Sequence, residues 1–273
     1  MTDLEDKERA LVGLLAEMPA VVVGYSGGVD SALLAAVAHE VLGPRSLAVT
    51  AVSPSLARRE LHAAQELAAR LGWRHELVET HEVEREEYAR NSSDRCYWCK
   101  TELFDLLGPL AEGLGAEIAV GTNTDDLGDY RPGLRAASDR SVRTPLADAG
   151  LAKSDVRALS ERRGLPTARK VASPCLASRF AYGVRVTPEG LRRIDAAEDL
   201  VRSFGFSEFR VRDHGDLARI EVPLEEVRRA AELSQTLSER LRELGFKYVT
   251  LDLSGFRSGS LNELLGPPAI RHP

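Results

Sequence analysis

The chain has 273 residues, of which 43% are hydrophobic and 29% are charged, a composition typical of an ordinary globular protein. Its net charge of -6 argues against a large nucleic-acid partner, because binding to a phosphate backbone depends on clustered lysine and arginine. No stretch approaches the ~20 continuous apolar residues of a membrane span, and the acidic start is unlike a targeting peptide, so we expect a cytoplasmic protein.

Strands and helices are predicted to alternate over the first half of the chain. An apolar run from Val21 enters a glycine turn and a helix, and further strands are predicted at 46–52, 74–79 and 117–123. The intervening helices are expected at 55–72, capped by Ser55 and closed by Gly72, and at 96–115, with a break near Pro109. This alternation predicts a doubly wound parallel α/β sheet, with ligands beyond the carboxyl ends of its strands.

The second half of the chain differs in composition and in the order of its predicted elements. Residues 127–181 are rich in arginine, proline and glycine, which indicates loops around a site, with one helix at 153–164. From Thr187 we predict a capped helix, strands at 208–215 and 217–223, a helix at 224–244 and a strand at 248–253. We therefore expect a domain at 1–183 and a smaller α+β domain at 184–273, with the boundary near Gly183.

The turn SGGVDS, residues 26–31, is built to bind an anion, because a strand–glycine–helix turn points free backbone N-H groups and a helix dipole at one place. No lysine occurs between Lys7 and Lys100, so this is not a Walker A loop. The alternative is a structural turn. The six residues resemble the PP-loop of the ATP pyrophosphatase superfamily, which cuts ATP between its α- and β-phosphates. The resemblance implies that the loop amides, Gly27 and Gly28 included, and the hydroxyls of Ser26 and Ser31 hold pyrophosphate, and that Asp30 helps to place Mg²⁺.

A second motif, GTNTDD, residues 121–126, ends the fourth predicted strand. Alone it could be an Asx turn that caps the next helix. It also resembles a segment of the same superfamily that contacts ATP phosphates and magnesium. That resemblance implies roles for Gly121, Thr122 and Asn123 at the nucleotide, and for Asp125 and Asp126 as metal ligands, since hard oxygen donors suit Mg²⁺.

Cys175 lies in a loop near Arg169, Lys170 and Arg179, and basic neighbours favour a thiolate. The alternative is a buried, inert cysteine. Together with CYWCK, PGLRAA, TPL and the terminal GFKYVTLDLSGFRSGSLN, the motif PCLASR resembles the LarE family, whose members make the nickel-pincer nucleotide cofactor as ATP-dependent sulfur transferases.

The LarE resemblance implies a reaction. A carboxylate of a pyridinium biscarboxylate mononucleotide attacks the α-phosphorus of ATP, pyrophosphate leaves, and sulfur displaces AMP from the acyl adenylate. In members that give up their own sulfur, the cysteine matching Cys175 becomes dehydroalanine. Arg210 and Arg212 match a pair of arginines that binds the substrate phosphate in the family. The alternative interpretation is that they simply lie on a solvated face of a strand. The resemblance also implies, more weakly, that Glu198 and Glu221 are ligands of a divalent metal ion. A homo-oligomer, a sulfide donor and partner enzymes of the pathway are also implied.

Cys96 and Cys99 form a C-x-x-C motif that fits a redox pair, half of a zinc site or part of an iron–sulfur site. With Cys175 they could hold a 4Fe-4S cluster with one iron open to sulfide. The LarE family includes three-cysteine members of this kind, so either sulfur source remains open.

Three other functions compete with this prediction. A PP-loop tRNA thiolase also combines the loop with cysteines, but the acidic composition shows no basic RNA-binding extension. PP-loop synthetases that deliver ammonia to an adenylate have no use for three cysteines. A non-enzymatic nucleotide sensor would bind ATP without cutting it.

Overall fold

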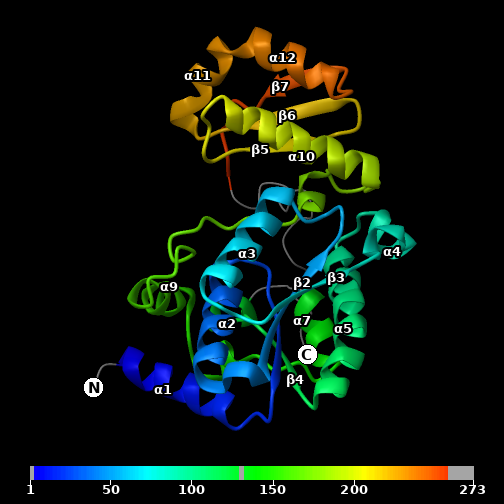
Figure 1. The fold of residues 1–273 in the computed structure, drawn as a ribbon. Helices are drawn as coiled ribbons and strands as arrows, with labels where there is room; N and C mark the ends of the chain where they lie inside the picture. The colour runs from blue at the N-terminus through cyan, green and yellow to red at the C-terminus, as the bar shows by residue number, and fades with distance from the viewer. Residues whose placement is uncertain (1–2, 129–131, 258–273) are drawn as a thin grey trace, which may run out of the picture. The chain divides into compact units, whose positions relative to one another are not determined.

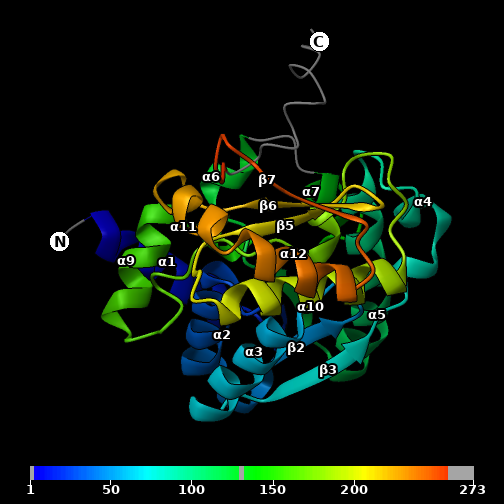
Figure 2. The same cartoon turned by 90° about the horizontal axis from the view of Figure 1, so that it is seen from above.

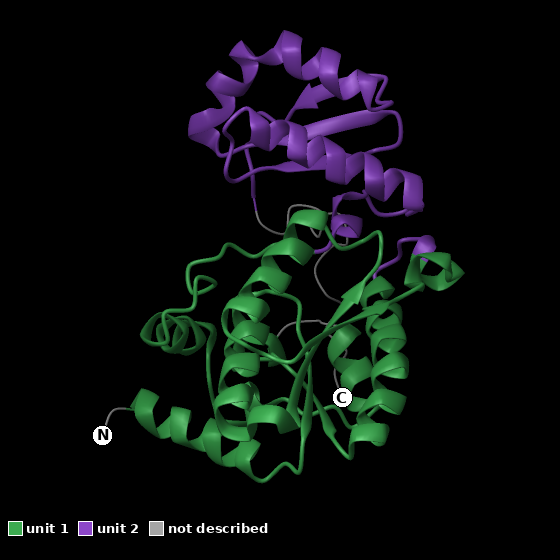
Figure 3. Cartoon of the chain, in the orientation of Figure 1, with its two compact units in different colours: residues 1–88, 94–174 green, residues 89–93, 175–273 purple. Residues whose placement is uncertain are grey.

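The computed structural model describes residues 3–128 and 132–257, which form two compact units (Figure 3). Unit 1 comprises Met1–Tyr88 and Asp94–Pro174. Unit 2 comprises Ala89–Ser93 and Cys175–Pro273.

Unit 1 is built on a parallel sheet with the strand order β3-β2-β1-β4. Its strands are β1 (Val21–Gly24), β2 (Ser46–Val52), β3 (His75–Glu79) and β4 (Glu117–Val120). The chain adds β2 and β3 on one side of β1 and then returns to add β4 on the other. The β1/β4 junction is therefore the point where the strand order reverses, and ligands bind outside the carboxyl ends of strands at such a point. The predicted parallel α/β sheet is confirmed.

Helices cover both faces of this sheet (Figure 1). The buried residues of α2 are almost all apolar, and this helix packs in one core with α1, α3, α8 and α9. A second core lies under α5 and α7. The bounds are α1 (Asp3–Ala16), α2 (Val29–Leu42), α3 (Arg58–Arg70), α5 (Arg95–Leu114), α7 (Pro132–Ser138), α8 (Pro145–Asp148) and α9 (Lys153–Arg162), with the shorter α4 (Glu86–Ala89) and α6 (Thr124–Leu127) and the 3-10 turns η1 (Gly43–Arg45) and η2 (Glu82–Glu84).

Two details of the predicted helices are wrong. Ser55 does not cap α3, because its hydroxyl donates to Glu82 Oε1 (2.7 Å) and the helix begins at Arg58. Helix α5 also continues through Pro109 without a break. A proline inside a helix costs about 3 kcal/mol. Here buried apolar side chains on both sides of it, including Leu107 and Ala111, offset that cost.

Unit 2 is a small α+β unit whose sheet has the order β5-β6-β7, antiparallel between β5 and β6 and parallel between β6 and β7. Helices α10 and α12 lie along the same face of this sheet (Figure 2). The predicted cap is present, since Thr187 Oγ1 accepts from the Gly190 amide (3.0 Å). The bounds are η3 (Leu176–Arg179), α10 (Pro188–Ser203), β5 (Arg210–Asp213), β6 (Leu217–Glu221), η4 (Leu224–Glu226), α11 (Val227–Glu232), α12 (Ser234–Glu243) and β7 (Tyr248–Leu251).

The helix predicted over 224–244 is divided in the structure. The backbone of Leu233 (ψ 6°) leaves the helical region between α11 and α12. The division lets each part bury its own apolar residues, Ala230 in α11 and Leu237 and Leu241 in α12.

The chain passes from unit 1 to unit 2 at 174–175, whereas the sequence placed the boundary near Gly183. The loop after Cys175 belongs to unit 2 because it is bonded to β5: the Ala181 amide donates to Asp213 O (3.2 Å). Asn91, which lies in the other stretch of unit 2, also donates its side-chain amide to Ala181 O (2.8 Å) and Val184 O (3.0 Å). Within the described residues, no helix combines the length and hydropathy needed to cross a membrane.

Gly121, the residue after β4, lies against the start of α2 and generates our first prediction. A Cβ at this position would stand 2.7 Å from the Ser31 amide nitrogen and 2.8 Å from the Asp30 carbonyl carbon. Backbone cannot yield as a flexible side chain can, so Gly121→Ala should lower the free energy of unfolding by about 1–3 kcal/mol, measured by urea denaturation. Gly113→Ala, where nothing lies within 4 Å, is the control and should be neutral or stabilising. Equal stability of the two variants would contradict this packing.

Candidate active site

The loop between β1 and α2 has a backbone that only glycine allows. Gly27 has φ +72°, and a Cβ there would lie 3.0 Å from the Cβ of Ala64. Gly28 is the N-cap of α2 and has no side chain to compete for the first amides of the helix. These amides and the helix dipole make an anion site at the carboxyl end of β1.

The two hydroxyls of the loop contact each other. Ser31 is buried, accepts from the Ser26 amide (3.2 Å) and donates to Gly28 O (3.1 Å). The two hydroxyl oxygens are also 3.2 Å apart. Ser31 therefore closes the loop on itself, while Ser26 is exposed.

The two sequence motifs meet at Asp30. Asn123, which is fully buried after β4, donates its side-chain amide to Asp30 Oδ1 (3.0 Å). The same side chain accepts from the Asp125 amide and caps α6, so the Asx-cap interpretation of GTNTDD also holds. Asp126 completes this cap by accepting from the Asn123 amide (3.1 Å). The motifs thus converge at the reversal point of the sheet.

Two lysines that motif reading missed lie at this loop. Lys153 Nζ is 2.5 Å from Asp30 Oδ2, and the Lys153 amide donates to Asp125 Oδ2 (2.9 Å). Lys170 Nζ donates to Gly27 O (2.9 Å). Both come from more than 120 positions beyond the loop in the chain. The sequence motif contains no lysine, but the folded site has two lysine ammonium groups beside it.

The acidic residues here offer oxygen donors of the kind that Mg²⁺ prefers. Asp30 and Asp125 are linked through Lys153, whereas Asp126 is used in the helix cap. Over residues 3–128 and 132–257, no three His, Cys, Asp or Glu side chains are grouped as a set of metal ligands. The donor chemistry of Asp30 and Asp125 fits magnesium bound together with nucleotide phosphates.

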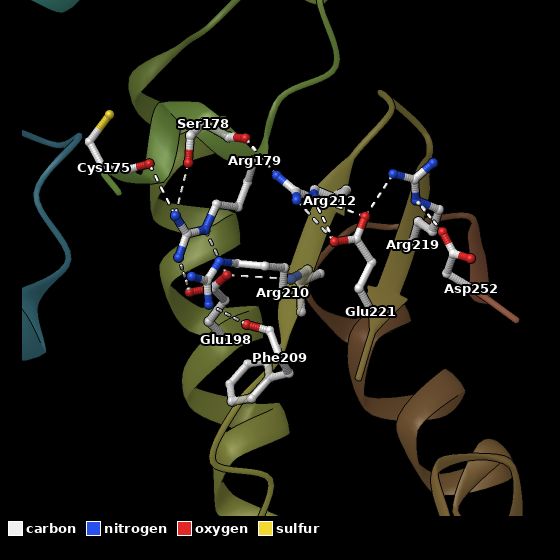
Figure 4. Close-up of polar contacts among 11 residues, drawn as sticks. Cys175, Ser178, Arg179, Glu198, Phe209, Arg210, Arg212, Arg219, Glu221 and Asp252 are labelled. Atoms are coloured by element: carbon white, nitrogen blue, oxygen red, sulfur yellow. Dashed lines mark hydrogen bonds and ion pairs between the residues drawn. The ribbon is translucent and has the colours of Figure 1, made fainter. Parts of the chain in front are cut away.

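In unit 2, Arg179 fixes the loop that carries Cys175 (Figure 4). Its guanidinium is 2.8 Å and 3.1 Å from the two oxygens of Glu198, and it also donates to Cys175 O (3.3 Å) and Ser178 Oγ (2.9 Å). Arg179 and Glu198 are 2% and 6% exposed. Cys175, itself half-buried, is therefore anchored through its backbone to a buried ion pair.

A second buried ion pair lies beside the first. Arg212 Nε is 3.0 Å from both oxygens of Glu221, and Arg212 also donates to Ser178 O (2.9 Å). Arg219 adds a second guanidinium to Glu221 (2.7 Å) and lies 3.6 Å from Asp252. Glu198 and Glu221, predicted as weak metal ligands, are thus arginine partners in this structure.

Arg210 lies beside these two ion pairs (Figure 4). Burial, together with the charges of Arg179 and Arg212, lowers the pKa of Arg210 to about 10. Guanidinium groups bind phosphate well, so this cluster is a candidate anion site.

The C-x-x-C cysteines lie in the first turns of α5 in unit 1, where Cys96 is exposed and Cys99 half-buried. Cys175 is the first residue of the long stretch of unit 2. Of the terminal motif, residues 258–262 lie outside the described residues.

Comparison with known proteins identifies the family. The chain is 38% identical to pyridinium-3,5-bisthiocarboxylic acid mononucleotide synthase of Lactiplantibacillus plantarum over 97% of both chains. This chain belongs to the LarE family. It is also 46% identical to an uncharacterised Synechocystis protein over 96% of this chain and 99% of that one. Residues 10–97 match the NAD synthase family. A 59-residue stretch is 44% identical to the NH(3)-dependent NAD(+) synthetase of Methanoregula boonei and covers 21% of this chain and 24% of that one.

This LarE-family protein is therefore an ATP-dependent enzyme of the PP-loop type. The match to NAD synthase includes β1, the glycine loop and α2, the part that holds nucleotide phosphates in such a fold. The full-length similarity to LarE also covers unit 2 and its arginine cluster.

The buried pair in α10 gives the second prediction. Removing the carboxylate in Glu198→Ala leaves Arg179 buried without its charge partner and should lower the free energy of unfolding by about 3–5 kcal/mol. Glu189, on the same helix, pairs with Arg192 at the surface, and Glu189→Ala should cost no more than about 1 kcal/mol. Chemical denaturation of both variants decides the matter. Similar losses in the two would mean that Arg179 has other adequate partners.

Proposed function

We propose that this enzyme converts carboxylate to thiocarboxylate on a pyridinium biscarboxylate mononucleotide, a precursor of the nickel-pincer nucleotide. The observation that carries this proposal is the junction at Asp30, where two PP-loop motifs meet, in a chain that resembles LarE over its whole length. ATP would be cut between its α- and β-phosphates.

The first step we propose is adenylation at the loop of unit 1. A substrate carboxylate oxygen attacks the α-phosphorus, the bond from that phosphorus to pyrophosphate breaks, and an acyl adenylate forms. The Gly27–Gly28 amides and the start of α2 would hold the departing pyrophosphate. Asp30 and Asp125 would hold Mg²⁺, and Lys153 would stabilise the charge of the departing pyrophosphate. When bound, Mg²⁺ supplies charge neutralisation on the phosphates.

The substrate's own phosphate would bind at the arginine cluster of unit 2. Arg210 and Arg212 belong to this arginine cluster, and Arg210 is held there by its bond to Phe209 O (2.7 Å) and its position over Phe256. Glu198 and Glu221 would orient the guanidinium groups. A divalent cation at these carboxylates would first have to displace the arginines.

The sulfur source has two candidates. In one, Cys175 Sγ attacks the acyl carbon and releases AMP, and elimination across its Cα–Cβ bond leaves thiocarboxylate and dehydroalanine. In the other, Cys96, Cys99 and Cys175 would hold a 4Fe-4S cluster, which when bound supplies an iron without a protein ligand. We favour the second, because all three cysteines would then have a use. The pair at the start of α5 provides two thiolates at ligand spacing.

We also propose a cytoplasmic homo-oligomer that acts on a small molecule, with sulfide delivered by a donor or another pathway enzyme. Because residues 10–97 are similar to NAD synthase, an ammonia-using synthetase is the alternative to the proposed sulfur transferase. Such an enzyme would form an amide rather than a thiocarboxylate.

The third prediction concerns the products of ATP. Purified protein incubated with ATP, Mg²⁺ and the biscarboxylate nucleotide should release AMP and pyrophosphate. ³¹P NMR identifies these products. Asp30→Ala and Lys153→Ala should each reduce this rate by about 10²-fold or more, because a positioned charge is lost from the reacting phosphates. Lys247→Ala, which removes an exposed ion pair, is the control. Formation of ADP and phosphate would refute the assignment.

The fourth prediction separates the sulfur sources. A cluster predicts brown anaerobic protein with about four irons per chain, loss of iron on substituting any one of the three cysteines, and an unchanged polypeptide mass after reaction. A colourless protein that becomes lighter by one hydrogen sulfide, with Cys96→Ala and Cys99→Ala still active, would leave Cys175 as the sacrificial donor. Metal and sulfide analysis with intact-protein mass spectrometry measures both.

A further inference from the structure

A short segment from Ala168 to Ser173, which we call the strap, is fastened to the PP-loop of unit 1. Lys170 Nζ donates to Gly27 O (2.9 Å) and is 2.6 Å from Glu60 Oε2. Arg157 of α9 holds the backbone of the strap by donating to Ala168 O (2.5 Å) and Lys170 O (3.1 Å). The reaction proposed above gives these contacts no role.

Lys170 fixes the direction of one loop amide. In a planar trans peptide the C=O and N-H groups point in opposite directions, and the described chain has no cis peptide. Because the ammonium holds the Gly27 carbonyl on one side, the N-H of Gly28 is presented on the other. Gly27 lacks a side chain and has φ +72°, so nothing of its own prevents this peptide from rotating.

Glu60 fixes Lys170 in turn. This carboxylate of α3 is 7% exposed and lies 2.6 Å from the Lys170 ammonium. Burial alone would raise the pKa of Glu60, but the hydrogen bond and charge of Lys170, with Arg59 and Ser173, outweigh burial and hold that pKa below its usual range. One buried carboxylate therefore holds the strap at Lys170.

We propose that Lys170 is a positioning residue for pyrophosphate binding, and that its pair with Glu60 links occupancy of the PP-loop to the chain that leads into Cys175. The inference rests on the proposed use of the loop to hold pyrophosphate. An anion on the Gly28 amide restrains the peptide, and the restrained carbonyl strengthens the grip on Lys170. Lys170 stands five residues before Cys175, so the restraint acts on the chain that leads to the thiol.

The first test is the affinity for inorganic pyrophosphate with Mg²⁺, measured by calorimetry. Lys170→Met should bind roughly ten- to a hundredfold more weakly, because a charge-assisted bond that orients the loop is lost. Lys170→Arg, which keeps the charge and donors, should recover most of the affinity. Lys7→Met is the matched control, since Lys7 is an ion-paired lysine of unit 1 that contacts Asp3 and Asp155 rather than the loop.

The second test is hydrogen exchange of residues 168–176, with and without saturating pyrophosphate. Wild-type protein should show slower exchange when pyrophosphate is bound, whereas Lys170→Met and Glu60→Gln should lose this response. Glu60→Gln removes the ion pair while keeping Lys170. This variant therefore tests the role of the pair even if Lys170→Met folds poorly.

Two outcomes overturn the idea in different ways. Wild-type affinity in Lys170→Met, or an undiminished exchange response at saturation in both variants, would refute the role of Lys170 alone. A wild-type protein that bound no pyrophosphate would refute the proposed function together with this inference.

Discussion

The contact on which the active site depends is the one between Asp30 and its two partners, Asn123 and Lys153. A single carboxylate at the start of α2 joins the end of β4 to the start of α9. It can do so because β1 and β4 are parallel neighbours whose carboxyl ends meet where the strand order reverses. Gly121 lets these backbones approach, and Gly27 lets the loop turn. The anion site follows from this geometry.

In unit 2, buried ion pairs hold charged side chains in fixed positions. Arg179 and Arg212 are each fixed by a buried glutamate. Arg179 also donates to the carbonyl of Cys175, and Arg212 donates to the carbonyl of Ser178. Burying such pairs gains little stability, but it leaves the guanidinium groups with little freedom to move. Arg210 lies beside them, and burial together with the charges of Arg179 and Arg212 lowers the pKa of Arg210, against the opposing effect of Glu198 and Glu221. The cluster thus gathers guanidinium groups beside the loop that carries Cys175 (Figure 4).

Local patterns predicted much of this protein. Hydrophobic periodicity identified the strands of the parallel sheet, and the predicted glycine turn lies between β1 and α2. The patterns failed where distant groups decide the outcome. Ser55 bonds to Glu82 instead of capping α3, and packing carries α5 through Pro109. Lys153 and Lys170 could not be assigned to the loop from sequence, because only the fold brings them there. The arginine partners of Glu198 and Glu221 were missed for the same reason.

The central claim is that a nucleotide carboxylate is activated by ATP and receives sulfur. The most direct test is the mass of the nucleotide after incubation with ATP, Mg²⁺ and anaerobic protein. We predict a product heavier than the biscarboxylate by the difference between one sulfur and one oxygen, formed by the wild-type protein and not by Asp30→Ala. A substrate whose mass is unchanged, or one that has gained an amide in the presence of ammonia, would contradict the account.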